Sequence, residues 1–150
     1  MPFNTTTANQ LLNWTLGNSA VSLAQNNIVY IGLSTNDPEA DGGTFTELTG
    51  DTNERVLIAQ AGASYPDCIG EAADRSIENT KQINWTKATT NWPTVKGFGL
   101  FNAKAGGQPY FYGKLEEDLN VVNGSVALFD PGALKISFPT SDAAAAAVSD

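Results

Sequence analysis

The segment VKGFGLFNAKAGGQPYFYGKL, residues 95–115, decides the fold because two runs rich in aromatic and apolar residues flank a Gly-Gly turn. Residues of these types fit a half-buried pleated surface, so each run predicts a strand. Gly106 and Gly107 supply the positive φ angles that tight hairpin loops require, and Pro109 fixes the start of the return strand. We therefore expect a central β-hairpin with its turn at residues 105–108.

Further strands are predicted on both sides of this hairpin. Residues 28–35, IVYIGLST, are apolar on nearly both faces, which is typical of a central strand. The turn triplet Asp130-Pro131-Gly132 indicates that the last pair of strands is joined there. The sequence therefore predicts a mainly β fold, a small antiparallel β-sandwich or barrel-like domain of six to seven strands. The other strands are expected at residues 55–60, 82–86, 125–129 and 133–138.

A helix is expected near the N-terminus. Thr5 to Thr7 offer N-caps, Gly17-Asn18 provides a stop, and the apolar residues between them follow a period of 3.6. Their stripe must cover the sheet or contact another subunit. A second short helix at 19–25 is a weaker prediction. The stripe consists of Ala8, Leu11, Leu12, Trp14 and Leu16.

The chain is expected to form a single domain over residues 1–150. Residues 1–26 would form an N-terminal arm and helix, residues 27–138 the β domain, and residues 139–150 an alanine-rich tail. Residues 62–79 are polar, broken by Gly and Pro, and without clear periodicity. Because such a connection is long for a compact domain, we expect a functional loop, a contact arm or disorder there.

Composition excludes several partners. The 16 acidic and 8 basic residues give a net charge of −8, which argues against nucleic acid binding. Ten of the acidic residues lie between Asp37 and Glu78, so one region carries a negative field. No apolar run approaches the ~20 residues needed to span a bilayer. The N-terminus has no basic residue before an apolar stretch, so neither a membrane partner nor a secretory signal is expected.

The residue types needed for common catalysis are scarce. The chain has no histidine, which excludes Ser-His-Asp and Cys-His nucleophilic sites and the usual zinc sites. Paired carboxylates could hydrolyse glycosides, but Glu116, Glu117 and Asp118 are merely adjacent and are expected in a solvated connection after the hairpin. We assign no catalytic, cofactor-binding or metal-binding residue and expect no cofactor.

Three other features have a chemical and a structural interpretation. Asp37 to Asp41 resembles half of a calcium loop, although Leu48 stands where an EF-hand needs Glu, so a looser Ca²⁺ site and a simple acidic turn both remain open. Cys68 is the one cysteine, has no basic neighbour and is interpreted as an incidental thiol. The three tryptophans could stack on a sugar, but core packing is favoured for Trp14, Trp85 and Trp92.

The order of several motifs resembles a family of short tailed-bacteriophage virion proteins, commonly labelled small tail fibre proteins. The motifs are YIGLSTNDPEADGG at residues 30–43, the Arg55-Val56 pair, the segment from residue 91 to residue 115, and FDPGALKISF at residues 129–138. Some similar proteins decorate phage heads as cement proteins. The chain departs from the family pattern at residues 52–54, where members often have Gly-Tyr-x, and at residues 65–76.

This resemblance implies a non-enzymatic virion structural protein, made in the host cytoplasm. We expect a capsid decoration protein on the head surface that binds the major capsid protein and copies of itself, as a trimer or a dimer. Phe3 and the N-terminal stripe are the expected contact. The alternative is a tail fibre or receptor-binding protein that contacts tail proteins or a host glycan, with a site near residues 65–71. A carbohydrate-binding or glycan-active module is a remote alternative.

Overall fold

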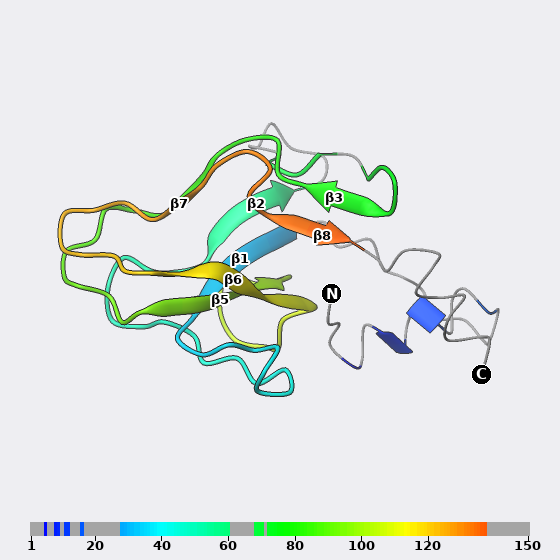
Figure 1. Cartoon of the computed structure of the whole chain (residues 1–150), viewed down its shortest axis with the longest axis horizontal. Helices are drawn as coiled ribbons and strands as arrows, with labels where there is room; N and C mark the ends of the chain where they lie inside the picture. The colour runs from blue at the N-terminus through cyan, green and yellow to red at the C-terminus, as the bar shows by residue number, and fades with distance from the viewer. Residues whose placement is uncertain are drawn as a thin grey trace.

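The computed structural model describes residues 28–60, 68–70 and 72–137, together with Thr5, Ala8, Asn9, Leu11, Leu12 and Leu16. This part of the chain forms eight strands in antiparallel sheets (Figure 1), which confirms the mainly β antiparallel class. The strands are β1 (Ile28–Ser34), β2 (Val56–Gln60), β3 (Ser76–Glu78), β4 (Ile83–Asn84), β5 (Val95–Phe101), β6 (Phe111–Leu119), β7 (Leu128–Phe129) and β8 (Lys135–Ser137).

One layer is a four-stranded sheet in the order β2-β1-β5-β6. β1 lies inside this sheet, and its side chains Ile31 and Leu33 are fully buried, as expected for a central strand. Gly97 on β5 is required by close packing, since a Cβ there would lie 2.5 Å from Pro38 Cδ and 2.9 Å from the Gly113 carbonyl oxygen. The loop after β1 therefore lies directly against the central hairpin.

The predicted hairpin of β5 and β6 is confirmed. The Tyr110 N–H donates to the Leu100 carbonyl at 2.8 Å, and Gly106 and Gly107 have φ angles of 74° and 72°. The other end of the hairpin is irregular. Between the pairs Val95↔Leu119 and Gly97↔Lys114, β6 places the four residues 115–118 opposite one residue of β5. This four-residue bulge changes the direction of the β6 side chains.

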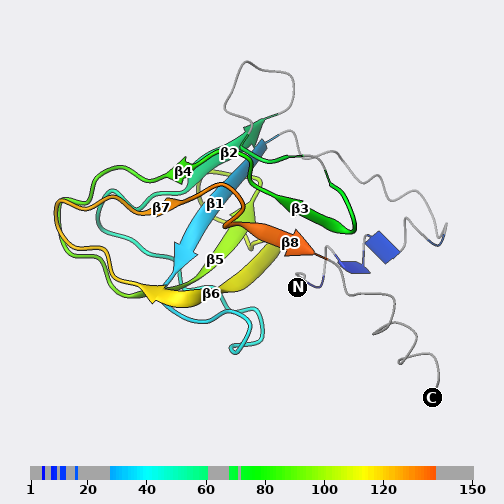
Figure 2. The ribbon, with the colours of Figure 1, turned by 45° about the horizontal axis from the view of Figure 1, so that its top comes forward.

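The second layer consists of two short pairs, β3 with β8 and β4 with β7 (Figure 2). The expectation of a last strand pair was wrong in its pairing, because β7 and β8 each pair with an earlier strand and not with one another. The buried Asn79 explains this. Its amide donates to the carbonyls of Lys81 and Asp130, and its Oδ1 accepts from the Leu134 N–H at 2.9 Å. The turn after β7 is thereby fixed to the bend after β3.

Part of the segment 62–79 is regular, which contradicts the alternative of disorder for that part and leaves a functional loop or a contact arm as predictions. It contains β3, and Cys68 is buried, with its N–H donating to the Ile58 carbonyl at 2.8 Å. The Cys68 carbonyl accepts from the Thr80 N–H at 2.8 Å, so this short piece lies between β2 and the residues after β3. A three-residue strand is too short to produce a periodic signal. Residues 61–67 and 71 lie outside the described residues.

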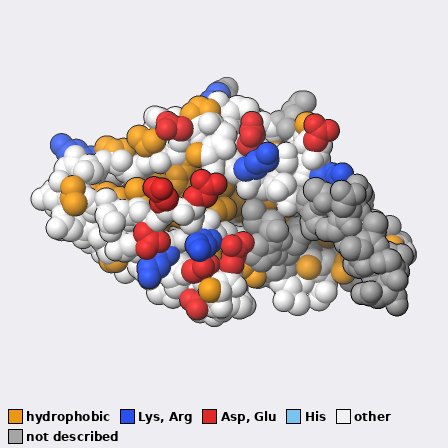
Figure 3. Space-filling view, in the orientation of Figure 1, with side chains coloured by type: hydrophobic (Ala, Val, Ile, Leu, Met, Phe, Trp, Pro, Cys, Tyr) orange, Lys and Arg blue, Asp and Glu red, His pale blue; other side chains and the backbone are white. Residues whose placement is uncertain are grey.

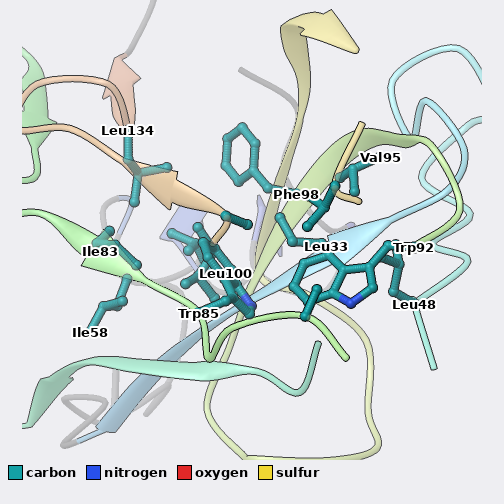
Figure 4. Packing of buried hydrophobic residues seen from close by; sticks show 14 of the residues in the cluster. Leu33, Leu48, Ile58, Ile83, Trp85, Trp92, Val95, Phe98, Leu100 and Leu134 are labelled. Atoms are coloured by element: carbon teal, nitrogen blue, oxygen red, sulfur yellow. The ribbon is translucent and has the colours of Figure 1, made fainter. Parts of the chain in front are cut away.

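The core lies between the two layers (Figure 4). Trp85 and Trp92 are 3% and 6% exposed, which confirms core packing for both of them. The ring of Phe129 packs edge-on against Trp85 at 5.5 Å and against Phe98 at 6.5 Å between centroids. Trp14 lies outside the described residues. The two described tryptophans are therefore unavailable for stacking on a sugar.

Most of the predicted N-terminal helix lies outside the described residues and stays a prediction. The Leu16 N–H donates to the Leu12 carbonyl at 3.0 Å, the spacing of one helical turn. Leu12 and Leu16 are 57% and 77% exposed. Phe3, the segment 19–25 and the tail 139–150 are not described. No helix in the part that the structure describes is long and apolar enough to cross a membrane.

Candidate functional site

Arg55, just before β2, organises the loops at one end of the domain. Its side chain is 2% exposed, and its Nε and Nη2 donate to the two carboxylate oxygens of Glu47 at 2.7 and 2.8 Å. Its Nη1 donates to the carbonyls of Ala103 and Gly106 at 2.9 and 2.8 Å. The guanidinium lies 3.3 Å from the centroid of the Phe101 ring. Arg55 thus joins the loop after β1 to the tip of the central hairpin.

A hollow of about 680 Å³ lies beside Arg55, between the loop 47–55 and the hairpin residues 104–106. Its strongest donor, the Arg55 side chain, is bound to groups of the chain itself. The ion pair between Lys104 and Glu54, at 3.4 Å, is exposed on both sides and contributes little stability. Arg55 and Glu47 therefore act structurally, whereas the buried Asn53 Nδ2 in the same lining has no hydrogen-bond partner among the described residues.

Asp51 fastens the same loop to the loop before β5. Its carboxylate accepts from the N–H groups of Thr89 and Thr90 at 3.0 and 3.2 Å, from Trp92 Nε1 at 2.7 Å, and from the Thr89 hydroxyl. The Thr89 hydroxyl contributes most to lowering the pKa of Asp51, and the donors from Trp92, Thr90 and Thr52 lower it further against an opposing effect of desolvation. We call these loops, joined through Arg55 and Asp51, the polar end.

The acidic loop 36–44 forms a hydrogen-bonded turn. The Asp37 Oδ1 accepts from the N–H groups of Glu39 and Ala40 at 2.9 and 3.3 Å, and Asn36 Nδ2 donates to Asp41 Oδ2 at 2.8 Å. Within the described ranges, no three His, Cys, Asp or Glu side chains gather closely enough to hold a metal ion. These hydrogen bonds account for the acidic turn, and nothing in the structure tests the alternative of a looser Ca²⁺ site at Asp37 to Asp41.

The three adjacent carboxylates belong to strand β6, not to the solvated connection expected for them. Glu116, Glu117 and Asp118 are exposed and lie within the four-residue bulge of β6 at the sheet edge. The bulge explains why the sequence pattern was misleading, because consecutive polar residues there do not follow the alternation of a regular strand. Charges on an edge strand oppose pairing with a second copy of the same edge.

A groove of about 470 Å³ lies between β6 and the chain from β7 to β8, and we call it the β6–β7 groove. Both walls are strands at the ends of their sheets. The floor is apolar and the rim carries charges of both signs. The apolar lining includes Phe98, Leu115, Leu119 and Phe129. The charged lining comprises Glu39, Lys114, Glu116, Glu117 and Lys135.

Exposed apolar side chains continue from this groove. Val126 and Leu128 are 45% and 40% exposed, and their spacing of two residues in extended chain places them on one face. Val122, 54% exposed, lies further along the same segment. Figure 3 shows hydrophobic side chains exposed among acidic and basic ones on the face that carries β6 and β7. We call Val126 and Leu128 the apolar ridge; with the groove it forms the candidate interaction surface.

Sequence reasoning missed this surface. It placed the expected contact on the N-terminal stripe, of which Leu12 and Leu16 are indeed exposed. The apolar alternation at Val126 and Leu128 was a usable signal, because a strand facing solvent on that side would carry polar residues. The groove itself had no local signal, since it depends on β6 and β7 joining different sheets and leaving a space between them.

An antiparallel β scaffold whose buried Arg55 and Asn79 are bound by its own loops, and which exposes apolar surface along strand edges, is typical of structural and adhesion proteins. The comparison with protein families agrees. A family model described as "Podophage GP4 fiber I protein gp80" matches residues 2–137, and the chain belongs to this family. The resemblance to short tailed-phage virion proteins labelled as tail fibres is thereby confirmed. No curated protein matches the chain.

Proposed function

We propose that the chain is a non-enzymatic fibre subunit of a podophage virion and acts through contacts with other proteins. The observation that carries this proposal is the family match over residues 2–137, whose description names a fibre protein. The geometry supports it, because exposed apolar side chains lie on the apolar ridge, which adjoins the apolar lining of the β6–β7 groove. Such surface gains free energy when a partner covers it.

The contact would work by excluding water from the groove floor and the apolar ridge. At about 25 cal/mol per Å² of apolar area, an interface of standard size has ample gross driving force before the costs of association. The charged rim, with Glu116 and Glu117 on one side and Lys135 on the other, would fix the orientation of the partner. Several copies on one particle would multiply a modest individual affinity.

The second candidate is capsid decoration, which the sequence alone favoured. It rests on the similarity of the motif order to cement proteins and uses the same contact physics. The family description names a fibre, so we place the fibre first. The two candidates differ in the partner and in the number of copies: a cement protein binds the major capsid protein all over the head, whereas a fibre protein binds at a few tail positions.

The deciding experiment is the copy number of this polypeptide per major capsid protein in purified virions, measured by quantitative mass spectrometry. A fibre subunit is expected in tens of copies at most, and labelled antibody should mark the tail. Hundreds of copies spread over the head would instead support decoration. Absence from purified virions would overturn both. Release of sugar from cell-wall polymers by the purified protein, abolished in Glu116→Gln or Glu117→Gln, would favour the glycan-active alternative.

A further inference from the structure

A second apolar hollow lies at another place in the fold, between the two layers. It has a volume of about 190 Å³ and is lined by the apolar residues of six strands, among them Val29, Ile77, Phe111 and Ile136. Glu78 is the one charged residue in the lining. A dry apolar cavity of about 150 Å³ accommodates a benzene ring, so this pocket has room for one large apolar side chain.

The pocket opens where the β domain begins and ends. Val29 is the second residue of β1, and Ile136 is the middle residue of β8. Figures 1 and 2 both show β1 beginning and β8 ending at the same end of the domain. Ile77 and Ile136 are directly opposite in the β3–β8 pair, so their side chains project from the same face into the pocket.

The most exposed large apolar side chains in the described part of the chain belong to the N-terminal segment. Leu16 is 77% exposed and Leu12 is 57% exposed, and the hydrogen bond between them places both on one helical face. The first 36 residues contain no Asp, Glu, Lys or Arg. This segment can therefore enter an apolar pocket without desolvating a side-chain charge. The β6–β7 groove, with its charged rim, is a poorer match.

The chain's own leucines do not fill its own pocket, because both remain exposed in the single chain. The 11 residues between Leu16 and Ile28 can span up to about 35–40 Å when extended, which is enough to reach a neighbouring copy. We propose that the Leu12–Leu16 face of one copy inserts into this pocket of a second copy, so that the chains associate by exchanging N-terminal arms. This inference rests on the proposed role of the chain in protein contacts and names one partner.

The test uses the purified full chain and its monomer–oligomer equilibrium, measured by sedimentation. Leu12→Asp with Leu16→Asp removes the arm contact, and Ile77→Phe fills the pocket from within. Each is expected to shift the equilibrium at least about tenfold toward monomer, because each prevents burial of a leucine side chain. Val122 is about as exposed as Leu12 and lies outside both the Leu12–Leu16 face and the pocket, so Val122→Asp should leave the equilibrium unchanged. Circular dichroism and thermal unfolding establish that each variant is folded, and Ile136→Phe replaces Ile77→Phe if the latter does not fold.

Mixing the two variants provides the sharpest result. The arm variant keeps an intact pocket and the pocket-filled variant keeps an intact arm, so the mixture should form hetero-oligomers at concentrations where each variant alone is mainly monomeric. Oligomers that persist in both variants, or folded monomers that fail to associate on mixing, would overturn the proposal. So would an arm variant that lowers thermal stability at unchanged oligomeric state, since that result indicates docking in the chain's own pocket.

This experiment involves no virions, so its outcome is separate from that of the fibre proposal. A chain that exchanges arms in solution but is absent from particles would refute the fibre and keep the arm exchange. If the chain is incorporated into tails but none of these substitutions changes its oligomeric state, the fibre proposal stands and the arm exchange is refuted.

Discussion

The polar end and the β6–β7 groove differ in what their side chains bind. At the polar end, Arg55 and Asp51 are saturated by partners from the same chain, some of them about 50 residues away in sequence. At the groove, Phe129 and Leu128 remain partly exposed between two strand edges. Strong polar chemistry therefore holds the loops in place, whereas apolar surface stays exposed at the groove. This division is expected of a structural protein.

The largest expected effect is at Arg55. Arg55→Leu leaves Glu47 and the carbonyls of the hairpin tip without their donor, and should lower the free energy of unfolding by about 3 kcal/mol. Breaking a buried ion pair costs about 3–5 kcal/mol, and we expect the lower value because the Glu47 side chain is 30% exposed. Urea denaturation measures the loss. Lys104→Met removes an exposed ion pair and should change stability by less than about 0.5 kcal/mol. Equal effects of the two substitutions would contradict the central position given to Arg55.

The second largest loss of stability is expected at Asn79, which holds the turn between β7 and β8 and so one wall of the β6–β7 groove. Asn79→Ala leaves the buried Leu134 N–H without an acceptor and frees the turn after β7, at an expected loss of about 2 kcal/mol. Proteolysis near residues 130–134 should accelerate as well, because the turn is no longer fixed to the bend after β3. Gln82→Ala, which removes one exposed hydrogen bond to Asp130, is the matched control. If both variants resist proteolysis equally, Asn79 does not hold this wall.

A smaller and pH-dependent effect is expected at Asp51. The folded-state pKa of Asp51 lies below its unfolded value, so its contribution to stability is complete above the ordinary Asp pKa and is lost as pH falls toward the lowered value. Asp51→Asn should be less stable than the parent at pH 7, and the difference should shrink on acidification below about pH 4. Thermal unfolding across this range measures it. A difference independent of pH would mean that the charge of Asp51 is irrelevant.

The smallest effect on stability, and the largest on function, is expected at the apolar ridge. Val126→Asp with Leu128→Asp changes exposed side chains, so stability should move by less than about 0.5 kcal/mol. Incorporation into virions should nevertheless fall at least tenfold, as judged by mass spectrometry of purified particles. Glu54→Gln, on an exposed side chain of the polar end, should affect neither quantity. Normal incorporation of the ridge variant would show that the apolar ridge is not a contact needed for assembly into the virion.

How much of this was predictable depends on how local each feature is. β1 and the β5–β6 hairpin were predictable because long runs of apolar and aromatic residues and the glycines 106 and 107 act within a few residues. The pairing of β7 and β8 was not, since it depends on Asn79, about 50 residues earlier in the chain. The buried role of Arg55 was equally hidden, because an arginine in a sequence normally predicts surface. The interaction surface lies between the consecutive strands β6 and β7, which belong to different sheets, and had only the weak signal of Val126 and Leu128.

The pairing of β1 with β5 also affects how the protein is made. β1 is fully apolar at its centre, yet its partner β5 lies more than 60 residues later, so a ribosome adding about 5–20 residues per second needs roughly 3–13 s to deliver it. During that interval the apolar strand β1 is not yet paired with β5. The chain has no charged side chain before Asp37. Such a strand is open to aggregation until residue 101 emerges, so the yield of folded chain should depend on what covers β1 during synthesis.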